Sequence, residues 1–351
     1  MRPDDYYPLV TVIMPIRNEA AYIRRSLGAV LAQDYPPERM EVLVVDGMSE
    51  DGTREAVEEL ASTHPHISVR LLDNPARITP AAFNIGLRHA RGEVIILVGG
   101  HCEIAPDYVR RCVEILERTG ADCVGGPVVP VGESFTARAI ALAQSSLFGV
   151  GSVPFRTRMN YAGYVDTVPF GAYRRQVFDR VGLFDEELVG GEDDEFNFRL
   201  KQSGGRIWLD PSIRSVYYTR RDLLGFWRQY FRYGFCKVRV IQKRRGIPSW
   251  RHLVPGAFVL GLGGSVLLAL LTHQPFWALS VALPYAVANG IASLWAARRD
   301  WKVLPLLPAA FTTLHLAYGL GFLWGLLWWG VISWSKARKQ SVADTRERTN
   351  G

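Results

Sequence analysis

The sequence lacks the motifs that mark several large enzyme classes. No GxGxxG motif follows an apolar run near the N-terminus, and no GxxxxGK[ST] motif occurs anywhere. These absences disfavour a dinucleotide-dependent dehydrogenase and a P-loop ATPase. Cysteine is scarce, with four residues and no CxxC pair: Cys102, Cys112, Cys123 and Cys236. A zinc ribbon and a dithiol redox site are therefore disfavoured, and we expect reduced, structural thiols.

Charged residues are missing from two long stretches. Residues 253–297 and 303–335 contain no Asp, Glu, Lys or Arg. Because about 20 apolar residues cross a bilayer core as a helix, these runs predict membrane spans. Two spans are expected in the first run, at 253–272 and 274–297. The second run would be about 50 Å long as one helix, so Gly319 and Gly321 near its middle predict a break into two more spans or a re-entrant pair. The alternative, a buried soluble helical domain, is disfavoured by the length of the runs and their tryptophans.

The net charge of +7 comes largely from residues that flank the apolar runs. Three basic clusters occur: Lys237, Arg239, Lys243, Arg244, Arg245 and Arg251; Arg298, Arg299 and Lys302; and Lys336, Arg338 and Lys339. The positive-inside rule places all three in the cytoplasm, which requires an even number of crossings and predicts two hairpins. Membrane lipid is therefore an expected partner. Nucleic acid is not, because no DNA- or RNA-reading motif is present.

The N-terminal part has the pattern of an α/β domain. Apolar runs at residues 9–16, 41–46, 67–72 and 94–98 alternate with helical patterns, which predicts an open, mostly parallel sheet with flanking helices. Ligands bind such sheets at the carboxyl ends of the strands. The polar residues just past those ends are Asn18, Glu19, Asp46, residues 74–77, His101 and Glu103. We expect them to converge on one edge, where an acidic rim suits a nucleotide and a divalent metal that bridges a diphosphate.

Residues 192–195 are four consecutive acids at the predicted start of a helix over 192–203. A carboxylate in this position can take a proton from a substrate hydroxyl. The alternative is a structural first turn whose negative charge is favoured by the helix dipole.

Three segments resemble glycosyltransferase family 2, most closely the succinoglycan-synthesis type of bacterial polysaccharide glycosyltransferase. They are VIMPIRNE at 12–19, VVDGMSEDGT at 44–53 and GEDDEFNFRL at 191–200. The resemblance covers roughly residues 9–240. It implies a GT-A fold and inverting transfer of a sugar from a nucleotide-diphosphate donor to a lipid-linked or growing glycan acceptor. The alternatives are a catalytically degenerate nucleotide-sugar-binding scaffold and, disfavoured by the size of the soluble part, a transporter.

The resemblance also implies roles for individual residues. Donor binding falls to Pro15, Asn18, Glu19, Asp46, Arg77 and Asn84. Asp46 would contact the base or ribose, and we expect it to lie across one cleft from Asp193. Asp193 would be the catalytic base, with Glu192 orienting the base or the acceptor. The alternatives are that Asp46 only ends its strand, that Asp51 caps the next helix, and that Arg77 is a surface residue.

The metal site departs from the family pattern. The family places Asp-x-Asp or Asp-Ala-His after the fourth strand, and here the segment is Gly99-Gly100-His101-Cys102-Glu103. His101 and Glu103 are the candidate ligands for Mn²⁺ or Mg²⁺, but Gly99 replaces a hard oxygen ligand that these ions prefer. The alternatives are that cationic side chains stabilise the leaving diphosphate and that His101 is structural.

Residues 227–234 are similar to the aromatic and arginine motif that clamps diphosphate or acceptor in processive relatives. Arg228 and Arg232 are four residues apart and share one helix face. The alternative is an interfacial amphipathic helix.

The expected domains are a catalytic domain at 1–221, an interfacial segment at 222–252, membrane helices at 253–335 and a cytoplasmic tail at 336–351. Because residues 1–7 include no secretory apolar region, we expect a multi-pass protein of the inner (plasma) membrane with a cytoplasmic catalytic domain.

Overall fold

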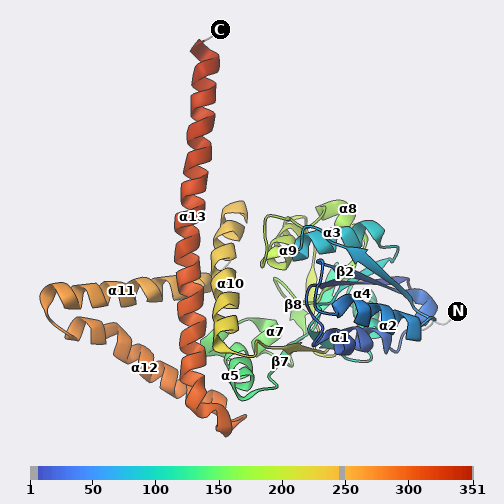
Figure 1. The fold of residues 1–351 in the computed structure, drawn as a ribbon, viewed down its shortest axis with the longest axis horizontal. Helices are drawn as coiled ribbons and strands as arrows, with labels where there is room; N and C mark the ends of the chain where they lie inside the picture. The colour runs from blue at the N-terminus through green and yellow to red at the C-terminus, as the bar shows by residue number, and fades with distance from the viewer. Residues whose placement is uncertain (1–6, 245–249, 350–351) are drawn as a thin grey trace. The chain divides into compact units, whose positions relative to one another are not determined.

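The computed structural model describes residues 7–244 and 250–349, with side chains described as far as residue 330. It divides into two compact units, Met1–Thr219 and Arg220–Gly351. Unit 1 contains the strands, and unit 2 contains long helices (Figure 1). Residues 1–6 and Arg245, which entered the predictions of topology, lie outside the described residues, as do the side chains of Lys336, Arg338 and Lys339.

Unit 1 is built on an eight-stranded sheet with the strand order β3-β2-β1-β4-β9-β6-β10-β8. Its strands are β1 (Val10–Ile16), β2 (Met40–Asp46), β3 (Ser68–Asp73), β4 (Val94–Leu97), β6 (Cys123–Gly125), β8 (Gly163–Tyr164), β9 (Ala172–Arg174) and β10 (Ile207–Leu209). The first four strands are parallel to one another, and β9 is antiparallel to both neighbours. The predicted fold class, an open and mostly parallel sheet, is confirmed for the segment that contains the four predicted strands.

A second, three-stranded sheet has the order β5-β11-β7. It consists of β5 (Cys102–Ile104), β7 (Val128–Val131) and β11 (Ser215–Tyr218). Strand β5 follows β4 closely in sequence, so this small sheet continues from the carboxyl edge of the large one. It brings β11, from the end of unit 1, next to His101 and Glu103.

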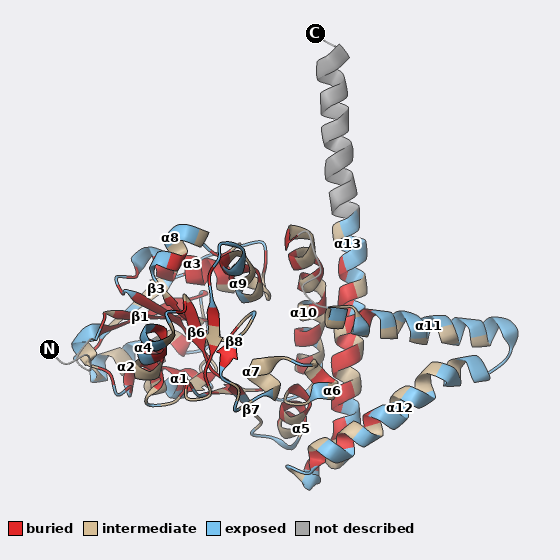
Figure 2. Ribbon diagram, turned by 180° about the vertical axis from the view of Figure 1, so that it is seen from behind, coloured by how far each residue is buried: buried red, intermediate tan, exposed pale blue. Residues whose placement is uncertain are grey.

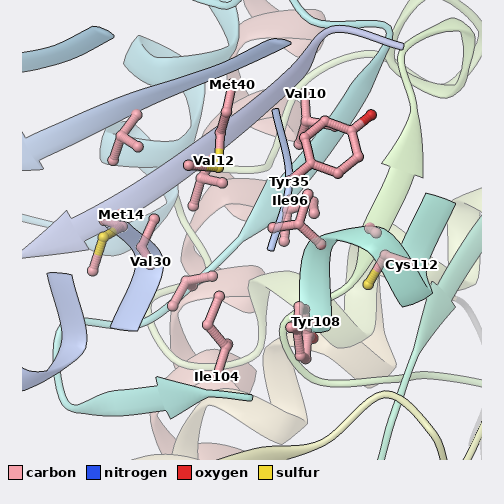
Figure 3. Packing of buried hydrophobic residues seen from close by; sticks show 14 of the residues in the cluster. Val10, Val12, Met14, Val30, Tyr35, Met40, Ile96, Ile104, Tyr108 and Cys112 are labelled. Carbon is pink, nitrogen blue, oxygen red and sulfur yellow. The ribbon is translucent and has the colours of Figure 1, made fainter. Parts of the chain in front are cut away.

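Helices cover both faces of the large sheet. They are α1 (Ile23–Leu31), α2 (Thr53–Thr63), α3 (Thr79–His89), α4 (Tyr108–Thr119), α8 (Gln176–Val181) and α9 (Glu192–Gln202). Three further helices lie by the small sheet: α5 (Phe135–Gln144) and α7 (Pro154–Thr157) contact β7, and α6 (Leu147–Val150) contacts α5. Alternate residues of a strand point to opposite faces, and β1 shows this directly. Val12 and Met14 pack with residues of α1 and α4 (Figure 3), whereas Ile13 packs with α3 on the other face. Because both faces are buried here, the central strands β1 and β4 are almost entirely apolar, as parallel strands are in α/β proteins.

Unit 2 contains α10 (Leu223–Arg244), α11 (Val254–Thr272), α12 (Phe276–Ala297) and α13 (Leu307–Thr349), with short 3₁₀ turns at Trp250–His252 and Trp301–Leu306. In the described residues, three helices are long and apolar enough to cross a membrane: Trp250–Thr272, Phe276–Ala297 and Trp301–Gly330. Their apolar side chains are widely exposed along α11 and α12 (Figure 2). Such a surface is unfavourable in water and suits lipid.

The predicted break at Gly319 and Gly321 is wrong, because α13 runs through both residues without interruption. The glycines instead permit close helix packing. A Cβ on Gly319 would lie 2.3 Å from the carbonyl oxygen of Pro255, and one on Gly321 would lie 2.0 Å from that of Phe231. Small residues at helix contacts are how membrane helices bring their backbones together.

The described residues contain three candidate spans where four were predicted, and this difference affects the predicted topology. If all three cross, the basic residues of α10 and those at 298–302 share one side of the membrane, and the part of α13 after the third span lies on the other. The prediction of two hairpins with all basic clusters in the cytoplasm therefore does not follow from this structure.

We predict that Gly321→Ala destabilises unit 2. The added methyl group collides with backbone on α10, which packs along α13, and overpacking of this kind costs about 1–3 kcal/mol. Thermal unfolding of the full chain in detergent measures the effect. Gly330→Ala is the matched control on the same helix, because its Cβ would meet nothing within 4 Å. Equal melting temperatures for the two variants would contradict the packing role.

Candidate active site

The loops after β1 and β2 are bonded to each other at the carboxyl edge of the sheet. The backbone N–H of Asn18 donates to the Ser49 hydroxyl (2.9 Å), and the side-chain oxygen of Asn18 accepts from the Glu50 N–H (3.0 Å). The N–H of Glu19 donates to the Thr53 hydroxyl (2.8 Å). The predicted convergence of these strand ends is confirmed.

Asp46 is the buried centre of this edge. Its carboxylate is fully inaccessible to solvent and accepts hydrogen bonds from the Ser49 hydroxyl (2.5 Å) and N–H (3.0 Å). Arg54 pairs with Asp46 at 2.7 Å and with the exposed Asp73 at 2.8 Å. These bonds raise the pKa of the Arg54 guanidinium above its ordinary value. Asp46 therefore does more than end its strand, because it sets the shape of the loop that follows.

Asp51 holds the start of α2, as its capping alternative predicts. Its carboxylate accepts from the Thr53 hydroxyl (2.5 Å) and N–H (3.2 Å) and from the Ala20 N–H (3.1 Å). Burial alone would favour the neutral acid, but these hydrogen bonds outweigh it and lower the pKa of Asp51. The residue joins two loops and is a structural part of the edge.

The loop after β3 joins the same network. The N–H of Asn74 donates to the Asp46 carbonyl oxygen (2.8 Å), and the N–H of Arg77 donates to the Asn74 carbonyl oxygen (3.0 Å). Arg77 is exposed and has a φ of +58°. Pro15 lies in β1 opposite Val45. The structure thus places Arg77 and Pro15 in segments next to Asp46, in keeping with their predicted grouping.

Backbone strain is concentrated at this edge. Five non-glycine residues of the described segments have a left-handed φ: Asn18, Met48, Arg77, Phe170 and His273. Three of them lie in the loops after β1, β2 and β3, and Phe170 lies just before β9, where the Gly171 carbonyl oxygen bonds the end of β4. Side chains with a Cβ disfavour this conformation, and such outliers cluster at functional sites. The residue types in these loops did not predict the left-handed φ values.

Asn84 makes its hydrogen bonds within the fold, and its predicted donor binding remains a prediction. Its side-chain N–H₂ donates to the Phe184 carbonyl oxygen and to the Glu186 carboxylate, both at 2.9 Å, and its oxygen accepts from the Phe184 N–H (2.9 Å). The residue is buried. Asn84 therefore fastens the loop that leads to the acidic segment, and its polar atoms are occupied there.

We predict that Asn84→Ala lowers stability and leaves donor affinity within about twofold. The change leaves the buried N–H and carbonyl oxygen of Phe184 without partners, which costs about 1–3 kcal/mol. Thermal unfolding and donor titration of the same preparation measure the two quantities. A selective loss of donor affinity, with stability unchanged, would support the donor-binding role.

His101 and Glu103 bind different partners. The His101 Nδ1 lies 2.8 Å from a Glu19 carboxylate oxygen. Glu103 accepts from the Tyr218 hydroxyl (2.5 Å), and burial together with this bond raises the pKa of Tyr218. No three His, Cys, Asp or Glu side chains in the described part of the chain form a group that could hold a metal ion. With Gly99 in place of an acid, this donor set fits Mn²⁺ or Mg²⁺ poorly, and the predicted His101–Glu103 pairing is not supported.

The four acids of 192–195 differ in what they contact. Glu192 turns back and accepts from the N–H groups of Gly190 and Gly191, both at 2.7 Å. Glu195 is buried and pairs with Arg199 at 2.7 Å. Glu192 therefore fixes the glycine turn before α9, in which Gly190 has a φ of +99° that favours glycine.

Asp193 lies on the first turn of α9 and is exposed. One carboxylate oxygen accepts from the Asp194 N–H (2.8 Å). The helix is fixed to β9 because the Tyr173 hydroxyl donates to the Asn197 side-chain oxygen (3.0 Å). Burial first, and the nearby Cys123 and Asp193 next, raise the pKa of Tyr173 well above its ordinary value. Asp193 is thus held near β9, which is separated from β2 and Asp46 by β1 and β4.

Arg228 and Arg232 are both exposed on α10, four residues apart, as their spacing predicts. They belong to unit 2. Their predicted contact with the donor remains a prediction.

The comparisons with known proteins agree with this arrangement. The glycosyl transferase family 2 pattern matches residues 11–182. The chain is 32% identical over 313 residues to the succinoglycan biosynthesis protein ExoA of Rhizobium meliloti, covering 89% of this chain and 93% of the relative. The chain belongs to glycosyltransferase family 2. The predicted resemblance is confirmed, and the protein is a glycosyltransferase that takes its sugar from a nucleotide donor.

Two further proteins are similar to this glycosyltransferase. It is 30% identical over 268 residues to a dolichyl N-acetyl-alpha-D-glucosaminyl phosphate 3-beta-D-2,3-diacetamido-2,3-dideoxy-beta-D-glucuronosyltransferase of Methanococcus voltae, covering 75% of this chain and 82% of the relative. Its fold is similar to that of the mannosyltransferase PcManGT of Pyrobaculum calidifontis, solved with GDP-Man and Mn²⁺, with a TM-score of 0.59, 23% identity and coverage of 91% and 88%. The predicted GT-A-like fold is confirmed.

Proposed function

We propose that this glycosyltransferase transfers a sugar from a nucleoside-diphosphate donor, with inversion, to a lipid-linked or growing polysaccharide acceptor at the cytoplasmic membrane face. The network that joins the ends of β1 to β4 around Asp46 carries the proposal, because it builds one polar edge where parallel sheets bind ligands. The loop after β2 and the exposed Arg77 are the groups we assign to the donor.

In the proposed step, an acceptor hydroxyl oxygen attacks the anomeric carbon of the donor sugar. The Asp193 carboxylate accepts the hydroxyl proton as the new bond forms. The bond between the anomeric carbon and the diphosphate oxygen breaks, and its electron pair leaves with the nucleoside diphosphate. An exposed carboxylate on a rigid helix, anchored by Asn197 and the buried Glu195–Arg199 pair, suits this role.

The acceptor is inferred from the membrane helices and from the relatives. The three apolar helices support attachment to a bilayer, and the basic residues of α10 support the cytoplasmic face, where anionic lipid is found. One relative is named for succinoglycan biosynthesis and another for a dolichyl-phosphate-linked sugar. An acceptor that lies in or near the membrane fits these observations.

The test is sugar transfer by the full chain in native membranes. Radiolabelled UDP-glucose, UDP-galactose, UDP-N-acetylglucosamine and GDP-mannose are supplied in turn, and the label is followed into organic-soluble lipid and into polysaccharide. We expect one donor to label one of these fractions. Binding of a nucleotide sugar without transfer from any donor would favour the scaffold function instead.

A further inference from the structure

The guanidinium of Arg156 has an unmet hydrogen-bonding group near the end of β4. Arg156 lies in the short helix α7, and its Nη1 atom is inaccessible to solvent and has no hydrogen-bond partner in the described part of the chain. A buried N–H without an acceptor is costly. Such a group persists where a ligand supplies the acceptor or where the fold requires the side chain for another reason.

Aromatic rings fix the position of this guanidinium. Its Cζ lies 5.9 Å from the centre of the Tyr217 ring and 5.7 Å from that of Phe155. Tyr217 in turn packs edge-on against the His101 ring, with the ring centres 5.1 Å apart. Arg156 and His101 therefore flank one tyrosine ring, and His101 is the residue bonded to Glu19 at the end of β1.

The strand pairing places Arg156 beside the segment that follows β4, because Arg156 lies over the Tyr217 ring. Cys102 pairs with Tyr217 across β5 and β11. The Arg156 cation thus lies within electrostatic range of the segment 99–103, where the expected acidic metal ligand is replaced by Gly99.

We propose that Arg156 binds the diphosphate of the donor and stabilises the negative charge that develops on it as it leaves. This inference rests on the proposed function of the same edge. A planar guanidinium suits phosphate oxygens because it donates two parallel hydrogen bonds and stays charged. It supplies positive charge next to a donor set that fits a divalent metal poorly, and electrostatic stabilisation of this kind is usually the largest catalytic effect.

The test compares nucleoside diphosphate with nucleoside. UDP, GDP, uridine and guanosine are titrated against the full chain in detergent, once with EDTA and once with Mn²⁺, for wild type, Arg156→Gln and Arg156→Lys. We expect Arg156→Gln to weaken binding of the preferred diphosphate about 10–100-fold and to leave the matching nucleoside within twofold. Arg156→Lys should lose less, because it keeps the charge. The matched control is Arg158→Gln, since Arg158 is exposed and stacks on Tyr161 at 5.8 Å; we expect no change.

Several results would overturn the assignment. Equal losses for diphosphate and nucleoside would mean that Arg156 only supports the fold, and unchanged diphosphate affinity in Arg156→Gln would remove it from the site. Diphosphate binding that requires Mn²⁺ and is unchanged in Arg156→Gln would show that a metal ion, and not Arg156, neutralises the diphosphate. In each of these cases wild type still binds the diphosphate, so the proposed function survives. If wild type bound neither UDP nor GDP with either EDTA or Mn²⁺, the proposed function would fail and this inference with it.

Discussion

Replacing Asp193 with asparagine should reduce the rate of sugar transfer by about 10²–10⁴-fold, the range that a general base contributes. The amide cannot accept the proton of the acceptor hydroxyl, yet it keeps the size of the side chain and an oxygen that can accept the Asp194 N–H. Donor affinity and melting temperature should stay close to wild type. Initial rates of transfer and donor titrations on the same preparation measure these quantities.

Asp194→Asn is the matched control for this experiment. It changes one charge on the same turn of α9, so we expect its transfer rate to stay within about threefold of wild type if only the base matters. An Asp193→Asn variant with near wild-type transfer would place the base elsewhere. Equal losses in the two variants would point to the summed charge of the segment, which is the structural alternative for residues 192–195.

The second large effect is expected for Asp46→Ala. The change removes the acceptor for both Ser49 bonds and one of the two partners of Arg54. Arg54 is partly exposed and keeps its pair with Asp73, so the loss comes mainly from the two Ser49 bonds, each worth about 1–3 kcal/mol, and the melting temperature should fall. Donor affinity should fall at least tenfold in the protein that remains folded, because the loop after β2 loses the group that shapes it.

The chain contains a control for this prediction as well. Asp73 pairs with the same arginine, but its side chain is 60% exposed, and exposed ion pairs contribute about 0–1 kcal/mol. Asp73→Ala should therefore change neither stability nor donor affinity appreciably. Asp46→Ala protein that is folded and binds donor normally would show that this edge of the sheet is not the donor site.

Much of the fold could be predicted because its signals are local. The four apolar runs became β1 to β4 within one or two residues of their expected ends, and the polar residues after them met at one edge. The carboxyl ends of parallel strands lie at one edge of a sheet, so this convergence follows from the strand order without any distant contact being known. The bonds that join Asn18 and Glu19 to the loop after β2 follow directly from that geometry.

The sequence was least informative where distant parts of the chain decide a residue's contacts. Asn84 bonds Phe184, a hundred residues later, and no local pattern distinguishes such a residue from a ligand-binding one. Gly321 was predicted to break its helix, but a glycine in an apolar run also permits a close helix contact, and only the presence of α10 beside it selects that role. Arg156, Tyr217 and His101 come from three separate segments, so no local pattern predicts that Arg156 lies near this edge.

The measurement that tests the account most directly is hydrogen–deuterium exchange of the full chain with and without nucleotide sugar. UDP-glucose, UDP-N-acetylglucosamine and GDP-mannose are the probes. We predict that the donor that binds slows exchange in the segments after the first four strands, at residues 16–20, 46–54, 74–78 and 99–102. Protection that spares these segments, under conditions where the donor is bound, would contradict the account.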